Sequence, residues 1–228
     1  MYWLTELFNF RIVADYADIF IDGIINTVWI SLVCLVLSIF FGIFLALMRM
    51  SSVGVIWRTA AAYIQFVRAT PLLIQIYLIY YGLPHLIGNF FNEMQTGVIA
   101  LTLHTTPFMA EIIRAGIMSV PRTQTEGAMA VGMSRPQVLY YIILPQAIAK
   151  LISPLLGQTV ILVKDTSLLS IIAVFELMGA GLLMFSETVS ATESYVTTAI
   201  CYLIIYLLML VASGFIQKKL SGNLAGAQ

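Results

Sequence analysis

Charged side chains are scarce in this chain. Only 10% of its 228 residues are Asp, Glu, Lys or Arg, whereas 61% are hydrophobic. A soluble domain carries about 25% charged residues, so these few charges cannot cover a globule of this size in water. We therefore expect lipid to be the solvent. Eleven basic residues balance eleven acidic ones, and with no excess positive charge we expect no nucleic acid partner.

Other absences exclude further classes. The only cysteines, Cys34 and Cys201, lie far apart in apolar runs, so neither a disulfide framework nor a metal-ligand spacing is present. No Gly-x-x-x-x-Gly-Lys-Ser/Thr phosphate loop occurs, so the chain cannot bind ATP by that route. The first residues are acidic and the first apolar run is too long for a signal-peptide core. We expect that run to be an uncleaved membrane span.

Long apolar runs are what the sequence does contain. A helix needs about 20 apolar residues to cross a bilayer, and five runs approach this length: 24–47, 70–86, 97–120, 147–167 and 197–215. They predict an all-α integral membrane protein with five transmembrane helices. The stretch 56–67 is expected to be a helix near the interface. No internal repeat appears, so we expect one transmembrane domain over 1–228.

The placement of charge predicts the orientation of these spans. One set of connections is basic and carries Arg49, Arg58, Arg122, Arg135, Lys218 and Lys219. The opposite set is acidic apart from Arg11 and carries Glu6, Asp15, Asp18, Asp22, Glu93, Glu187 and Glu193. Cytoplasmic loops collect Lys and Arg. We therefore expect the N-terminus and segment 1–23 outside, and loop 121–138 and the C-terminus in the cytoplasm.

Residues 126–145, called the elbow below, form the most informative stretch. Its first part, from Glu126 to residue 131, can form a short helix. There the small residues Gly127 and Ala128 would let another surface approach closely.

The second part of the elbow contains residues that end one helix and begin another. Gly132 can supply a left-handed corner. Ser134 can cap a helix that contains Arg135 and tolerates Pro136 in its first turn. The pattern predicts two short helices that project into the cytoplasm and end near Pro145. From spacing alone, a docking knob and an ordinary polar loop remain equally open.

The elbow resembles the coupling motif of permease subunits of ABC importers. It reads Glu-Gly-Ala, three residues, Gly, and later Ile-Ile-Leu-Pro, with Gly127 where the family usually has Ala. Three more stretches are similar to the polar amino-acid branch: RATPLLIQ at 68–75, AEIIRAGI at 110–117 and KDTSL at 164–168. Thr-Pro-Phe at 106–108 stands where Gly-Ala-Tyr is usual. The resemblance covers nearly the whole chain.

The resemblance implies a type I importer in the bacterial cytoplasmic (inner) membrane. Two permease subunits, identical or related, would pair in the membrane, and an extracytoplasmic substrate-binding protein would deliver a small-molecule amino acid. Two ABC ATPase subunits would carry ATP and Mg, so this chain would be a transport subunit without cofactor or metal. The expected ATPase-coupling residues are Glu126, Gly127, Ala128, Gly132, Ser134, Arg135 and Pro145.

Polar residues within the spans are candidates for the translocation pathway, because lipid tolerates them only when they are paired or face water. These candidates are Glu111, Gln158, Lys164 and Asp165. Glu111 can instead pair with Arg114, three residues on. Gln158 and Asp165 share a helix face, which can line a water-filled path or form a polar seam. We expect Asp165 to meet the cargo's ammonium group and Lys164 to pair with another helix or with the sister subunit. Both residues can also be structural.

Three rival functions are open. The same machine can carry another small zwitterion, such as an opine or a compatible solute. A secondary transporter would use Glu111, Lys164 and Asp165 as an ion relay, but five spans without an inverted repeat argue against it. A membrane scaffold or sensor leaves the elbow unexplained.

Overall fold

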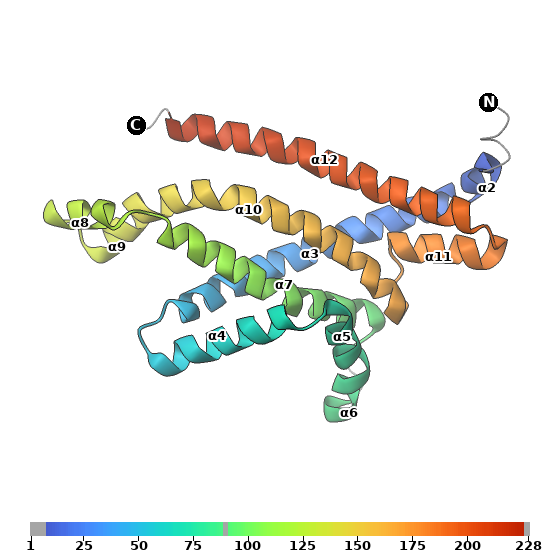
Figure 1. Ribbon diagram of the computed structural model, residues 1–228, viewed down its shortest axis with the longest axis horizontal. Helices are drawn as coiled ribbons and strands as arrows, with labels where there is room; N and C mark the ends of the chain where they lie inside the picture. Colours follow the sequence, from blue (N-terminus) through green and yellow to red (C-terminus); the bar gives the residue numbers. More distant parts are fainter. Residues whose placement is uncertain (1–7, 89–90, 226–228) are drawn as a thin grey trace. The chain divides into compact units, whose positions relative to one another are not determined.

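Every element of the described chain is helical. The computed structural model describes residues 8–88 and 91–225 (Figure 1); Glu6 lies outside these ranges. Four helices are long: α3 (Ala17–Arg49), α7 (Glu93–Met118), α10 (Leu144–Asp165) and α12 (Ala191–Ala225). Shorter elements lie between them or before them: α2 (Phe10–Asp15), α4 (Gly54–Ala69), α5 (Leu72–Tyr77), η1 (Leu78–Gly82), α6 (Leu83–Ile87), α8 (Arg122–Ala130), α9 (Arg135–Gln137), η2 (Val138–Ile143), η3 (Thr166–Ile172) and α11 (Leu177–Thr188).

Four helical segments are long and apolar enough to cross a membrane. They are Ala17–Arg49, Glu93–Met118, Arg135–Ile172 and Ala191–Phe215. Each overlaps one of the predicted apolar runs, and each begins before it. The difference arises because polar and charged residues at the ends of these helices continue the helical hydrogen bonding, whereas the hydropathy pattern ends with the apolar side chains.

The second predicted run, 70–86, is helical from Leu72 onward, and a break at its start separates it from α4. α4 ends at Ala69 and α5 begins at Leu72, and only the pair Gly54–Ala69 and Leu72–Leu86 taken together qualifies as a span. Pro71 lacks a backbone N–H and disfavours the helical conformation of Thr70, which explains the break. The described chain therefore has four candidate spans, or five if the interrupted pair is one span.

The chain packs as two compact units, each assembled from three stretches. Unit 1 comprises Met1–Val36, Thr70–Leu103 and Val160–Met209, whereas unit 2 comprises Leu37–Ala69, His104–Thr159 and Leu210–Gln228. Every long helix contributes residues to both units.

The core of unit 1 consists of two apolar clusters. The first is formed mainly by buried aliphatic residues, including Ile30, Ile76, Leu101, Leu162 and Leu169, with the fully buried Cys34 among them. The second is formed by Phe20, Val163, Leu177, Ala180, Met184 and Ile205. These clusters join segments that are distant in sequence, so unit 1 is held together by apolar packing.

Unit 2 has a core of small residues. Ala46, Ala60 and Ala110 are nearly inaccessible and pack with Leu45, Ile64 and Ile113. A Cβ added at Gly42 of α3 would lie 2.9 Å from the Met109 Cβ on α7. Small residues at such contacts let two helix backbones approach closely, which is the usual basis of helix packing in membranes.

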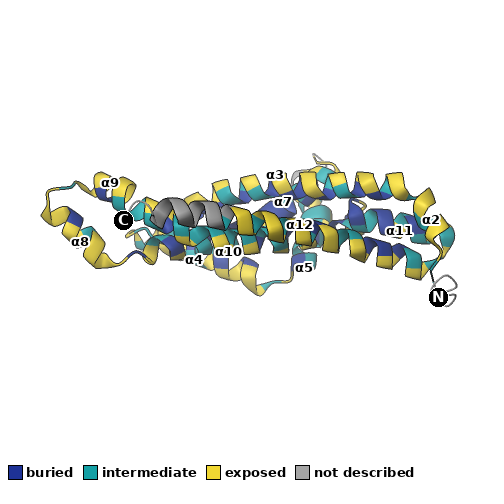
Figure 2. Ribbon diagram, turned by 90° about the horizontal axis from the view of Figure 1, so that it is seen from above, coloured by how far each residue is buried: buried dark blue, intermediate teal, exposed yellow. Residues whose placement is uncertain are grey.

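Large apolar side chains cover much of the outside of the long helices. On α3, Trp29 is 61% exposed and Phe44 is 53% exposed; on α12, Leu208 is 65% exposed. Figure 2 shows exposed residues along much of α3 and α12. A surface of this kind is unfavourable in water and suited to hydrocarbon.

Candidate functional site

The first part of the elbow is a helix closed by a glycine. α8 begins at Arg122, earlier than the sequence predicts, because Pro121 suits a helix start. Gly132 has φ of 89°, as predicted. Its N–H donates to the Met129 carbonyl at 3.0 Å, and the N–H of Met133 donates to the Ala128 carbonyl at 3.1 Å. These two bonds form a Schellman motif, which satisfies carbonyl groups at the end of α8.

The second part of the elbow begins with a cap. Ser134 precedes α9 as predicted, and its backbone N–H donates to the Gln137 side chain at 2.8 Å. Arg135 and Pro136 occupy the first turn of α9. η2 follows without a break, and Pro145 is the second residue of α10, so its missing N–H leaves a carbonyl of η2 without its helical hydrogen bond.

The two parts of the elbow pack on one another and leave one side of α8 free. Ala128 and Val138 are buried, and α8 contacts η2. Glu126 and Gly127 are exposed, and a Cβ at Gly127 would meet nothing within 4 Å. Figure 2 shows α8 as mostly exposed. The elbow therefore presents a carboxylate beside a glycine on an uncovered surface, while Ala128 faces inward.

Unit 2 also contains a cavity of about 500 Å³ with a basic lining. Its charged residues are Arg68, Glu111, Arg114 and Lys150, and Gln158 lies in the same wall. The cavity thus brings together two of the four predicted pathway residues, Glu111 and Gln158.

Interactions within the wall hold these charges in place. Arg114 Nη2 lies 2.7 Å from Glu111 Oε2, which confirms the predicted pair, and Arg49 Nε lies 4.0 Å from Glu111 Oε1. The guanidinium of Arg68 lies 5.5 Å from the centre of the Phe108 ring. Lys150 Nζ donates to the Ser119 carbonyl at 2.9 Å. The two arginine partners neutralise Glu111, which in turn holds their guanidinium groups in position. The other charged residues of the wall are cationic, so the wall retains excess positive charge.

The other two predicted pathway residues belong to unit 1. Lys164 is exposed, and its Nζ lies 5.6 Å from the centre of the Tyr206 ring at the edge of a cavity of about 230 Å³. Asp165 is half-buried, and within the described residues its carboxylate accepts no hydrogen bond. The adjacent side chains therefore differ in exposure, as their angular separation on a helix leads one to expect.

Sequence reasoning missed a buried carboxylate in unit 1. Glu176 is completely buried at the N-cap of α11, where it accepts a hydrogen bond from the Gly179 N–H at 2.9 Å and from the Tyr202 hydroxyl at 2.6 Å. Burial raises the pKa of the Glu176 carboxyl, and the hydrogen bond from Tyr202 opposes this. The signal was present: an isolated Glu lies just before an apolar helix, where the helix N-terminus stabilises a carboxylate.

Among the described residues, no group of three or more His, Cys, Asp or Glu side chains is arranged to hold a metal ion. The elbow exposes Glu126 and Gly127, and the cavity of unit 2 is lined by three cationic side chains, Arg68, Arg114 and Lys150.

Comparison with known proteins gives consistent matches over most of the chain. Residues 38–222 match the family described as "Binding-protein-dependent transport system inner membrane component". The probable glutamine ABC transporter permease protein GlnM of Bacillus subtilis (strain 168) is 35% identical over 212 residues, which cover 93% of this chain and 98% of that protein. The L-cystine transport system permease protein TcyL of the same strain is 28% identical and covers 96% of this chain and 95% of that protein.

Solved structures agree. A chain of an amino acid ABC transporter crystallised with histidines superposes with a TM-score of 0.86 at 32% identity, covering 91% of this chain and 96% of that chain. A chain of the MetNI methionine ABC transporter in an inward-facing conformation superposes with a TM-score of 0.73 at 18% identity, covering 89% and 96%. The second likeness concerns the fold alone. Together they show the fold of a type I ABC importer permease.

Proposed function

Since the chain belongs to the family of binding-protein-dependent transport system inner membrane components, we propose that it carries a polar amino acid across the membrane. It is a multi-pass permease subunit of an ABC importer and not an enzyme. The observation that carries the proposal is the match, over nearly the full chain, to permeases named for glutamine and cystine and to a solved amino acid transporter.

The elbow is proposed to couple this permease to ATP hydrolysis on a partner. Two ABC ATPase subunits, which hold ATP and Mg, would each receive the exposed side of α8 from one permease. Glu126 and Gly127 form the contact surface, and Gly132 fixes the corner behind them. Ala128 packs inside the elbow. Ser134 and Arg135 lie at the start of α9, and Pro145 lies in the first turn of α10. Closure of the ATPases would therefore move α8, α9 and α10 together.

Two further partners complete the proposed machine. A second permease, identical or a sister chain, pairs with this one in the membrane, and an extracytoplasmic binding protein delivers the cargo. ABC transporter complexes among the solved relatives support partnership with ATPase and permease subunits in general.

The orientation is proposed from the charge of the two units. Acidic residues dominate unit 1, whose only basic residues are Arg11 and Lys164, and basic residues dominate unit 2, whose only acidic residues are Glu111 and Glu126. Because cytoplasmic segments collect Lys and Arg, we place five spans with the N-terminus outside and the C-terminus and elbow in the cytoplasm.

Asp165 is the proposed contact for the cargo's ammonium group. Its carboxylate is half-buried and accepts no hydrogen bond within the described residues, and an unsatisfied carboxylate is expensive in a membrane unless a cation or water reaches it. Gln158, which lies in the basic cavity of unit 2, is proposed as a separate residue of the pathway. Lys164 is proposed to face a neighbouring helix or the sister permease.

The test is uptake by the assembled transporter in proteoliposomes. Radiolabelled glutamine, cystine, histidine and arginine are offered with and without ATP inside, and a betaine and an opine serve as competitors. ATP-dependent uptake of at least one amino acid supports the proposal. Uptake of the amino acids without ATP would contradict the proposal. So would a transporter that recognises only the betaine or the opine and none of the amino acids.

The role of Asp165 needs a matched substitution. Asp165→Asn should change the apparent substrate affinity or selectivity while complex assembly and basal ATPase activity survive. Asp18→Asn, an acidic residue in the first turn of α3, serves as the control. Unchanged transport of all four amino acids would remove Asp165 from the pathway, and loss of assembly would assign it a structural role.

A further inference from the structure

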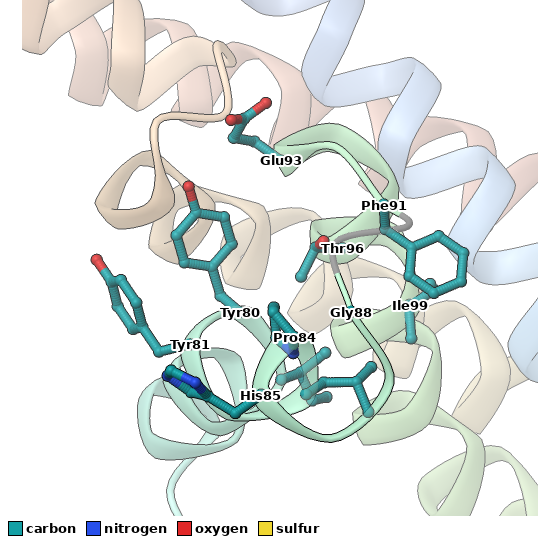
Figure 3. A pocket seen from close by; sticks show the side chains of 11 residues that line it. Tyr80, Tyr81, Pro84, His85, Gly88, Phe91, Glu93, Thr96 and Ile99 are labelled. Carbon is teal, nitrogen blue, oxygen red and sulfur yellow. The ribbon is translucent and has the colours of Figure 1, made fainter.

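Unit 1 contains a cavity of about 450 Å³ that the proposed transport pathway does not use. It lies between the turn formed by η1 and α6 and the first turns of α7 (Figure 3). We call it the aromatic recess, because its lining includes Tyr80, Tyr81 and Phe91 beside His85, Glu93 and Thr96. A volume of this size suits a small molecule.

A π-helical turn arranges the two tyrosines. Tyr80 and Tyr81 lie in η1, and their ring centroids are 4.8 Å apart with an interplanar angle of 83°. Two adjacent rings at this angle form a corner with ring faces in two directions. π-Helical turns interrupt α-helices rarely and occur frequently at functional sites. Ring faces of tyrosine attract organic cations and are the usual walls of sites for ammonium groups.

A carboxylate without an internal partner lies in the same lining. Glu93 is exposed in the first turn of α7 and forms no ion pair among the described residues. Of the two basic residues of unit 1, Lys164 lies over the Tyr206 ring, and Arg11 belongs to α2. In Figure 3 the hydroxyl ends of Tyr80 and Tyr81 point toward the side on which Glu93 lies.

We infer that the aromatic recess binds a small organic cation that carries an ammonium or guanidinium group. The ring faces of Tyr80 and Tyr81 surround the charge, Glu93 neutralises it, and Phe91 covers the apolar part of the ligand. Full negative charge on one side and aromatic faces on the other select against anions and against neutral molecules of the same shape. The inference rests on the lining of the recess and does not depend on which solute the permease carries.

The test observes the tyrosines directly. The transporter, assembled with its ATPase and permease partners and without the binding protein, is labelled with 3-fluorotyrosine in nanodiscs. The fluorine resonances are assigned with Tyr80→Phe and Tyr81→Phe. Titration with ethylguanidinium should shift both resonances saturably, whereas ethylurea, its neutral isostere, should not. Glu93→Gln should weaken the binding of ethylguanidinium by about tenfold or more.

Matched variants separate binding from folding. Asp18→Asn removes a first-turn carboxylate elsewhere in unit 1 and should leave the titration unchanged. Tyr81→Leu, followed through Tyr80, should weaken binding, and Tyr81→Phe should retain it. The inference would be overturned if ethylurea shifted the resonances as much as ethylguanidinium does, or if the shifts did not saturate. It would also be overturned if Glu93→Gln and Tyr81→Leu bound ethylguanidinium as tightly as the unmodified protein.

Discussion

The Tyr202 hydroxyl donates a hydrogen bond of 2.6 Å to Oε2 of Glu176, and this bond joins α12 to the N-terminus of α11. The remaining oxygen of Glu176 accepts from the Gly179 N–H, and the neighbouring Leu177 N–H donates to the Thr27 hydroxyl of α3 at 3.0 Å. Three helices of unit 1 thus meet at one buried carboxyl group. The arrangement uses polar bonds to fix an orientation that apolar packing alone would leave less specific.

Removing the hydroxyl should destabilise the protein. Tyr202→Phe leaves the buried Glu176 with one partner fewer, which costs about 1–3 kcal/mol. The thermal unfolding midpoint of the purified protein in detergent should fall. Tyr206→Phe is the control, because its ring already contacts Lys164 and the ring is retained. Identical midpoints for Tyr202→Phe and the unmodified protein would contradict this reading.

The same carboxyl group predicts a pH dependence. Since burial raises the pKa of Glu176 above its ordinary value of 4.5, the folded protein binds this proton more tightly than the unfolded chain does. The stabilisation is full below pH 4.5 and is lost as the pH rises through the raised pKa. In Glu176→Gln, whose side chain cannot ionise, the thermal unfolding midpoint should depend less on pH between pH 4.5 and the raised pKa. A steeper dependence in the variant would show that the sign is wrong.

The elbow predicts a contrast between two glycines. Gly132 has a positive φ, which a β-branched residue adopts at a cost of about 1–2 kcal/mol. Gly132→Val should therefore distort the corner, loosen the ATPase subunits and abolish uptake, while the protein still inserts into the membrane. Gly127→Ala is the matched control, because its Cβ meets open space and alanine favours the helix.

Two measurements check this contrast: co-purification of the ATPase subunits and ATP-dependent uptake. Glu126→Lys, which reverses the charge on the exposed side of α8, should resemble Gly132→Val. Normal uptake together with a normal yield of the ATPase in Gly132→Val would remove the elbow from the coupling mechanism.

The proposed orientation predicts opposite labelling of two positions. A cysteine at position 93 should react with an impermeant maleimide in intact cells, and a cysteine at position 219 should react only after the membrane is permeabilised. The unmodified chain is the background, since Cys34 is fully buried and Cys201 partly so. The reverse pattern would place the N-terminus in the cytoplasm.

The sequence was most informative where a local pattern has only one physical solution. Long apolar runs predict membrane helices, and the spacing of Gly132, Ser134 and Pro136 predicts the corner and the cap that the structure contains. The Glu111–Arg114 pair follows from a separation of three residues on a helix. The corner, the cap and the ion pair depend on residues within about two helical turns of one another, and the apolar runs depend on the composition of one continuous segment.

Features that depend on tertiary packing were not predictable in this way. Tyr202 and Glu176 are 26 residues apart, and nothing in their spacing indicates that they meet. The aromatic recess joins η1 to the start of α7, two segments whose contact no spacing in the sequence indicates. Pro71 is compatible with a helix break at this point, but the helix predicted over 56–67 ended two residues before Ala69, where α4 ends.

The π-helical turn η2, Val138–Ile143, bears on how the chain tolerates changes in length. Such a turn accommodates about one residue more than an α-helical turn does. Deleting one residue here would let the segment relax into ordinary α-helix while α10 keeps its rotational phase. A deletion later in α10 would instead turn every following side chain by about 100°. Homologous permeases that differ by one residue in this region should therefore show the difference at η2, with the register of Gln158 and Asp165 preserved.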